Sequence, residues 1–95
     1  MEFSREIRDE VRSGEITVTF RLWRRLMVKP GGRYRVADFY IEVDTIDLVP
    51  FSSIDDEDIR QSGEDDRESF RQRAAHAGPV EDDTLLYRIE FHVAS

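Results

Sequence analysis

Gly14-Glu15-Ile16-Thr17-Val18-Thr19-Phe20-Arg21 is the stretch of sequence that carries the most information about the fold. Its apolar residues alternate with threonine and arginine, and this period of two predicts a strand with one buried face. On that parity Thr19 and Arg21 share the opposite face, so both can point into one groove.

Patterns on either side of this strand predict the remaining elements. Phe3, Ile7 and Val11 recur every four residues, which predicts a short amphipathic helix that ends at Gly14. Strands are expected over 33–36 and 39–48, the second with a β-bulge near Asp44-Thr45, where its alternation slips. Two short helices are expected next, one capped by Ser53 and ending at Gly63, the other over about 66–77, followed by a strand over about 84–93.

This order of elements predicts the fold class. Strands do not alternate with helices, so we expect an α+β fold in which the strands curl toward a small twisted β-barrel. The barrel is expected to have about five strands, with two to three short helices flanking it. A chain of 95 residues has room for one domain, which we place at residues 1–95.

The composition excludes several classes of site. The chain has no cysteine, so disulfides, thiolate zinc sites and cysteine nucleophiles are excluded. His76 and His92 are its two histidines, too few for an all-histidine metal site, and we expect no metal, no cofactor and no catalytic residue. No apolar run approaches the roughly 18 residues that span a bilayer, and the first five residues do not resemble a signal peptide. We therefore expect a cytoplasmic protein without a membrane partner.

Charge is distributed unevenly along the chain. Residues 1–35 carry nine basic and five acidic side chains, a net charge of +4, whereas residues 36–95 carry five basic and sixteen acidic ones, a net charge of −11. Between Ile16 and Ala37 there is no acid but six cations, Arg21, Arg24, Arg25, Lys29, Arg33 and Arg35. Such asymmetry indicates a nucleic-acid partner. The alternative is that the basic face pairs electrostatically with the acidic helices of the same fold.

The loop Arg21-Leu22-Trp23-Arg24-Arg25 mixes cations with an aromatic ring. Guanidinium groups bind phosphate through two parallel hydrogen bonds, and an indole face can stack on an unpaired base. This mixture favours single-stranded or looped RNA, whose bases are free to stack. The alternatives are that Trp23 is a packing residue and that Arg21 forms a cross-strand ion pair with Glu42 or Glu90.

The stretch 14–21 resembles the ASCH-domain signature Gly-x-Lys-x-x-Thr-x-Arg, and the order of elements resembles this PUA-like family over nearly the whole chain. The resemblance implies a β-barrel with an RNA-binding cleft beside the motif. Some members are amidohydrolases that act on acetylated cytidine through the motif lysine, the motif threonine and a downstream glutamate. The threonine and arginine correspond to Thr19 and Arg21, the lysine corresponds to Ile16, and the glutamate falls at or near Ser62, with Glu64 the nearest acid beyond it.

Isoleucine has no lone pair, so Ile16 cannot move a proton as a lysine can, and we expect no catalysis by this mechanism. The predicted function is nucleic-acid binding, RNA more than DNA, by a monomer or weak dimer. The predicted contact residues are Thr19, Arg21, Trp23, Arg24, Arg25, Lys29, Arg33 and Arg35. Two alternatives stay open: a hydrolase acting on a modified nucleoside or on RNA, and a protein-interaction module whose basic loop docks an acidic partner or a second copy.

Overall fold

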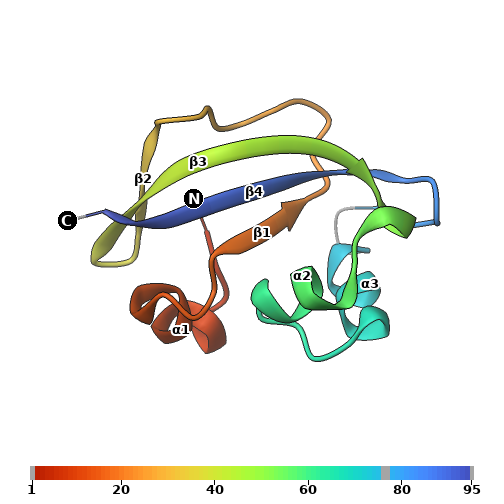
Figure 1. Ribbon diagram of the computed structural model, residues 1–95, viewed down its shortest axis with the longest axis horizontal. Coiled ribbons are helices and arrows are strands. Elements are labelled where there is room, and N and C mark those ends of the chain that lie inside the picture. The colour runs from red at the N-terminus through yellow and green to blue at the C-terminus, as the bar shows by residue number, and fades with distance from the viewer. Residues whose placement is uncertain (1, 76–77, 95) are drawn as a thin grey trace.

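Four strands form one antiparallel sheet in the order β1-β4-β3-β2 (Figure 1). This computed structural model describes residues 2–75 and 78–94. The strands are β1 (Val18–Arg21), β2 (Arg33–Val36), β3 (Phe39–Pro50) and β4 (Leu85–Ala94). Every strand is therefore predicted at its correct place in the sequence, with small differences in its ends.

The long ladder between β3 and β4 runs from Tyr40 opposite Ala94 to Pro50 opposite Leu85. Its register shifts between Val43 and Thr45, which confirms the β-bulge expected there. A bulge adds one residue to one strand and bends it, and this increases the local twist. The bent ladder arches over the helices in Figure 1.

The helices lie together below the sheet in the view of Figure 1, α1 under one half and α2 with α3 under the other. They are α1 (Arg8–Ser13), α2 (Asp56–Gln61) and α3 (Arg67–Ala74), with two 3-10 turns, η1 (Arg5–Ile7) and η2 (Phe51–Ser53). Gly14 ends α1 in the left-handed conformation, as the sequence predicts. The last expected residues of the second acidic helix, 76–77, lie outside the described residues.

The expected cap of α2 is wrong. Asp55, not Ser53, occupies the N-cap, and its carboxylate accepts a hydrogen bond of 2.8 Å from the main-chain N–H of Asp58. Ser53 instead ends η2 and donates its hydroxyl hydrogen to the carbonyl oxygen of Pro50. The extended backbone at Asp55 places its side chain beside the first free N–H groups, as a cap requires.

Three hydrophobic clusters hold these layers together. The first joins the N-terminal helical segment to the sheet through Phe3, Val11, Ile16, Val36, Ile41 and Phe91. The second packs α2 and α3 against the sheet and consists of Phe51, Ile54, Ile59, Phe70, Val80 and Leu86. The third, Val28, Val43 and Ile89, attaches the long loop between β1 and β2 to the sheet.

Leu86 corrects the predicted burial pattern of the last strand. The alternation there predicts that Tyr87, Ile89, Phe91 and Val93 form the buried face. Ile89 and Phe91 are buried and the other two are half-buried, but Leu86, on the opposite parity, is fully buried. Both faces of β4 are thus covered at its start, because the α2 and α3 cluster packs against that end.

The α+β class is confirmed, with four strands among the described residues where about five were expected. No ladder joins β1 to β2 in the part of the chain that the structure describes, so the curled sheet stays open on that side. Within residues 2–75 and 78–94 no helix is long and apolar enough to cross a membrane.

Gly63 offers a test of how the end of α2 packs against Ile16, which precedes β1. Both Gly63 and Gly14 have positive φ angles, +94° and +88°, but an added Cβ at Gly63 would lie 2.7 Å from Cδ1 of buried Ile16, while Gly14 has open space. Gly14→Ala should cost about 1–2 kcal/mol for the left-handed backbone. Gly63→Ala should cost about 1–3 kcal/mol more, because it also overpacks the core. Urea unfolding of both variants measures this difference, and equal losses would contradict the contact.

Candidate functional site

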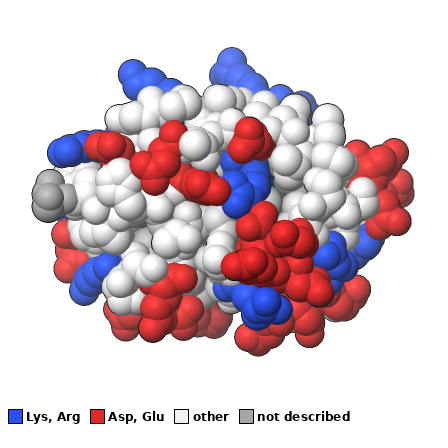
Figure 2. Space-filling model, in the orientation of Figure 1, with Lys and Arg blue, Asp and Glu red and all other residues white. Residues whose placement is uncertain are grey.

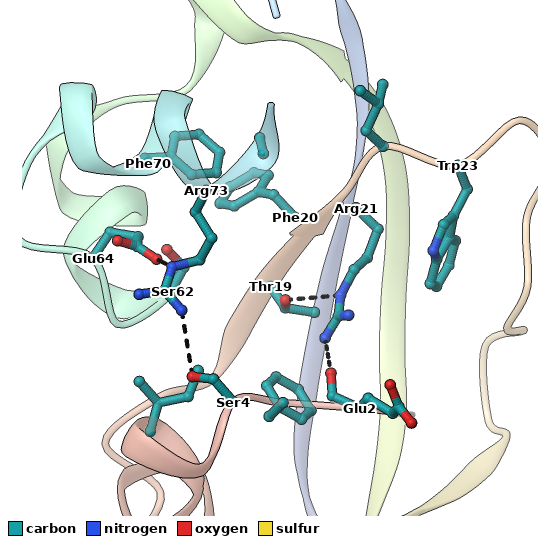
Figure 3. A pocket seen from close by; sticks show the side chains of 14 residues that line it. Glu2, Ser4, Thr19, Phe20, Arg21, Trp23, Ser62, Glu64, Phe70 and Arg73 are labelled. Carbon is teal, nitrogen blue, oxygen red and sulfur yellow. Dashed lines mark hydrogen bonds and ion pairs between the residues drawn. The ribbon is translucent and has the colours of Figure 1, made fainter. Parts of the chain in front are cut away.

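A cleft of about 270 Å³ lies at the edge of the sheet beside β1 (Figure 3). Because β1 is the first strand in the sheet order, it pairs with β4 on one side alone. The cleft is lined by 2–4 and Ile7 of the N-terminal segment, by 19–23 of β1 and the loop after it, by Ser62 and Glu64, and by Phe70 with 73–74 of α3. The N-terminal segment and α3, which are far apart in the sequence, therefore meet here.

Arg21 crosses the cleft from β1. Its Nε donates to Oγ1 of Thr19 at 3.2 Å, and its Nη2 donates to the main-chain oxygen of Glu2 at 2.6 Å. The guanidinium also lies 5.0 Å above the ring of Phe3. Burial lowers the pKa of Arg21, and the nearby Glu2 carboxylate offsets this in part.

The cross-strand ion pair considered for Arg21 does not form. Glu42 pairs with Arg33, and Glu90 pairs with Arg88. Within the described part of the chain no carboxylate makes an ion pair with Arg21. Its charge is held by neutral oxygens and an aromatic ring, an arrangement that leaves the guanidinium able to attract an anion.

Thr19 is the neighbour of Arg21 on the same side of β1, as its parity predicts. Its side chain is almost fully buried, and its hydroxyl oxygen accepts the hydrogen bond from Arg21. Thr19 lies opposite Ile89 in the ladder, so its side chain is on the same face of the sheet as that buried residue. The residue contributes to the floor of the cleft and orients Arg21.

Glu64 and Arg73 form an ion pair on the opposite wall of the cleft. Arg73 also donates to Oγ of Ser4 at 3.3 Å, so it links α3 to the N-terminal segment (Figure 3). Burial raises the pKa of the Glu64 carboxyl, and Arg73 opposes that rise. The Glu64 side chain is 9% exposed. Glu64 and Arg21 both line the cleft, so an acid with a raised pKa and an arginine share this space.

The resemblance pointed to Ser62 and Glu64, and the structure places both in the cleft. Arg73 was not among the predicted site residues. A signal for it exists in the sequence: Arg73 follows Phe70 by three residues, and residues three apart share a helix face. Since Phe70 is buried on the inner side of α3, Arg73 lies near that inner side as well.

Trp23 stands at the mouth of the cleft and is half-buried. Its ring centroid lies 6.2 Å from that of Tyr87, and the ring packs against the cluster under the loop. Trp23 therefore packs on the sheet and also lines the cleft, and its role in stacking on a base stays a prediction.

The other predicted cations divide into two groups. Arg24, Arg25 and Lys29 are exposed on the loop, and none of the three makes an ion pair with a described residue. Arg33 and Arg35 lie on β2, at the opposite edge of the sheet order from β1. Nε of Arg33 donates to Glu42 at 3.2 Å, and Nε of Arg35 donates to the carbonyl oxygen of Ala37 at 2.8 Å.

Figure 2 shows how these charges are arranged on one face of the molecule. Basic side chains project along the upper rim, where the loop between β1 and β2 runs in Figure 1. Acidic side chains gather at the lower right, where α2 and α3 lie. On this face the basic loop thus lies apart from the acids of α2 and α3.

No protein-family model matches the chain, and no curated protein matches it in sequence. Its structure does have counterparts. A crystal structure of an ASCH domain from Lactobacillus crispatus JV V101 superposes with a TM-score of 0.70 and 20% identity, over 90% of this chain and 68% of that chain. The chain has an ASCH-like fold. The resemblance predicted from the motif and the element order is confirmed at the level of the fold.

Two further structures share the ASCH-like fold. A hypothetical protein called PH0355 gives a TM-score of 0.76 at 18% identity, over 99% of this chain and 96% of that chain. The protein EF3133 from Enterococcus faecalis V583, of the family DUF984, gives 0.66 at 17% identity, over 88% of this chain and 64% of that chain. Similarity at these identities describes the fold and leaves the activity to be argued from the cleft itself.

Ile16 stands where the ASCH signature has lysine, and it is 2% exposed in the core cluster beside Phe3. Its side chain does not line the cleft. An apolar residue at this position fits the core of this chain and supplies no group that can transfer a proton.

The raised pKa of Glu64 makes a prediction about stability. A carboxyl whose folded pKa exceeds its ordinary value of 4.5 binds more protons in the folded state. Its contribution is therefore fully present below that value and is lost as the pH rises through the folded pKa. The free energy of unfolding of the wild type should thus fall, relative to that of Glu64→Gln, as the pH is raised from about 4 to about 7.

Urea unfolding at a series of pH values measures this difference. Glu57→Gln, on the exposed side of α2, is the matched control and should follow the wild-type curve. A constant difference between the wild type and Glu64→Gln across this range would contradict the assignment.

Proposed function

We propose that the chain binds nucleic acid, and RNA in preference to DNA, through β1 and the loop that follows it. One observation carries the proposal: Arg21 and Trp23 line a cleft, and the adjoining Arg24 and Arg25 are exposed without ion pairs to described residues. Cations and an aromatic face are thereby contiguous over five residues of the chain.

Phosphate contacts are the first part of the proposed interaction. An arginine that is already paired with a carboxylate must break that pair before it can bind phosphate. Arg24, Arg25 and Lys29 have no such pair to break among the described residues, whereas Arg33 has one with Glu42. The loop is therefore a better phosphate-binding surface than β2, and such contacts dominate affinity for a nucleic acid.

A stacked base is the second part. Trp23 is fixed against Tyr87, so its ring is already oriented and loses little freedom when a base stacks on it. The volume of about 270 Å³ lies just below the usual range of about 300–1,000 Å³ for ligand pockets. The cleft thus suits one unstacked base or nucleoside better than a larger ligand. Bases that are free to leave a stack belong to single strands and loops, which favours RNA.

The test is a titration of labelled single-stranded RNA at several salt concentrations, with DNA of the same sequence for comparison. Binding should weaken with salt, because each phosphate contact releases counterions. The slope of log K against log salt is negative, and Arg24→Ala with Arg25→Ala should make it shallower by roughly 1–1.5, since each single-strand contact contributes about 0.7 to its magnitude.

Arg5→Ala with Arg60→Ala removes the same charge from two exposed arginines elsewhere and should leave the slope unchanged. Equal loss in both double variants would indicate a general charge effect and would remove the loop from the proposal. Salt-sensitive self-association in light scattering, without binding of RNA or DNA, would instead support the protein-interaction module.

A second candidate function is hydrolysis of a modified nucleoside or of RNA. It is favoured by the meeting of Thr19, Ser62 and Glu64 in one cleft, where Glu64 is an acid with a raised pKa. If this site is catalytic, acetylated cytidine should be turned over, and Thr19→Val should abolish turnover because it removes the hydroxyl. Chromatography of the products measures this, with Thr17→Val, at an exposed threonine two residues earlier, as control. No turnover of acetylated cytidine or RNA would eliminate the candidate.

A further inference from the structure

Three side chains that could bind a metal ion meet on the exposed surface of β3 and β4, away from the cleft. They are Glu42 and Asp44 of β3 and His92 of β4, each of which offers one donor atom. These donor atoms all lie within 4.8 Å of one another. None of the three lines the cleft, so the group is independent of the proposed RNA-binding surface.

The sheet register builds this cluster. Glu42 lies directly opposite His92 in the β3–β4 ladder, and side chains of such pairs are close enough to interact. Asp44 is the residue at the bulge, between Val43 and Thr45, and has no partner of its own across the ladder. Glu42 and Asp44 are two residues apart and so lie on the same face of β3, which brings a second carboxylate to His92.

The imidazole of His92 lies between the two carboxylates. Its Nδ1 is 2.8 Å from Oδ1 of Asp44, and its Nε2 is 3.9 Å from Oε2 of Glu42. Oε1 of Glu42 accepts from Nε of Arg33, which orients the carboxylate and leaves Oε2 directed to the ring. Each acid therefore presents an oxygen to one imidazole.

The donor atoms lie within 4.8 Å of one another, so small side-chain rotations bring them to the spacing of a coordination sphere. Zinc bonds to nitrogen and oxygen donors are about 2.0–2.2 Å long, so two donors of one tetrahedral ion lie roughly 3.3 Å apart. The gap of 3.9 Å between Nε2 of His92 and Oε2 of Glu42 is about 0.6 Å wider than this, and Asp44 contacts the other ring nitrogen, Nδ1, so the ring or the Asp44 side chain must rotate before all three reach the same ion. All three side chains are partly exposed, so they have room to make that adjustment.

The donor set selects the kind of metal. Magnesium and calcium prefer oxygen donors alone, whereas an imidazole nitrogen suits zinc and related transition metals. We propose that Glu42, Asp44 and His92 bind one zinc ion, with water in the fourth position. Arg33 supports the site from β2 by holding the Glu42 carboxylate in place, as groups outside the metal's own ligands commonly do.

From the sequence we expect no metal, since two histidines are too few for an all-histidine site. A single histidine and two acids become a ligand set through strand register, which joins positions 42, 44 and 92 across a separation of about fifty residues. The one signal in the sequence is the spacing of Glu42 and Asp44, which puts two carboxylates on one face of a strand.

The experiment is calorimetric titration of zinc into the metal-free chain, with magnesium as a second titrant. The wild type should bind one zinc ion per chain and should not bind magnesium measurably. His92→Gln and Glu42→Gln should each weaken zinc binding at least tenfold. Both side chains are partly exposed, so neither variant should unfold, and circular dichroism checks this.

His76→Gln replaces the other histidine of the chain and should leave zinc affinity unchanged. Three results would overturn the proposal: no zinc binding by the wild type, equal binding by His92→Gln, or equal losses in His92→Gln and His76→Gln. Because the RNA titration uses a metal-free chain and different residues, failure of one proposal does not decide the other.

Discussion

The β3–β4 ladder is the interaction on which the rest of the structure depends. It is the longest ladder in the sheet, it carries β1 and β2 on its two sides, and its bulge at Asp44 bends it. Because the ladder is bent, different helices pack against its two ends, α1 at one end and α2 with α3 at the other. The cleft is the space left between these two covers at the edge of β1.

Two arginines show how the fold uses its charges. Arg88 is held by Asp58 of α2 at 2.8 Å and by Glu90, and the hydrogen bonds to Asp58 raise its pKa, so it ties the helix layer to β4. Arg21 is held by a carbonyl oxygen and a hydroxyl instead, and burial lowers its pKa. The charge of Arg88 is neutralised by carboxylates within the fold. The charge of Arg21 faces the cleft, and for this reason the proposed function is placed there.

Local patterns predicted more of the fold than of the site. Alternation and capping glycines depend on neighbours in the sequence, so the strands, the bulge and the end of α1 at Gly14 could be predicted. The cap of α2 was missed because Ser53 and Asp55 are both good caps, and the 3-10 turn that takes up Ser53 is fixed by the packing of Phe51. Thr19 and Arg21 could be assigned to one groove by parity, but Arg73 reaches that groove only through the packing of α3 against the N-terminal segment.

The sequence by itself determined the α+β class, the position of the motif strand and the concentration of cations in one third of the chain, because each of these is a property of residues that are near one another along the chain. The tertiary structure decided which of those cations keep their charge available. Arg33 is paired with Glu42 from a neighbouring strand, while Arg24 and Arg25 project where no described acid pairs with them. Ion pairs depend on distances in space, and register and curvature set those distances only when the whole sheet has formed.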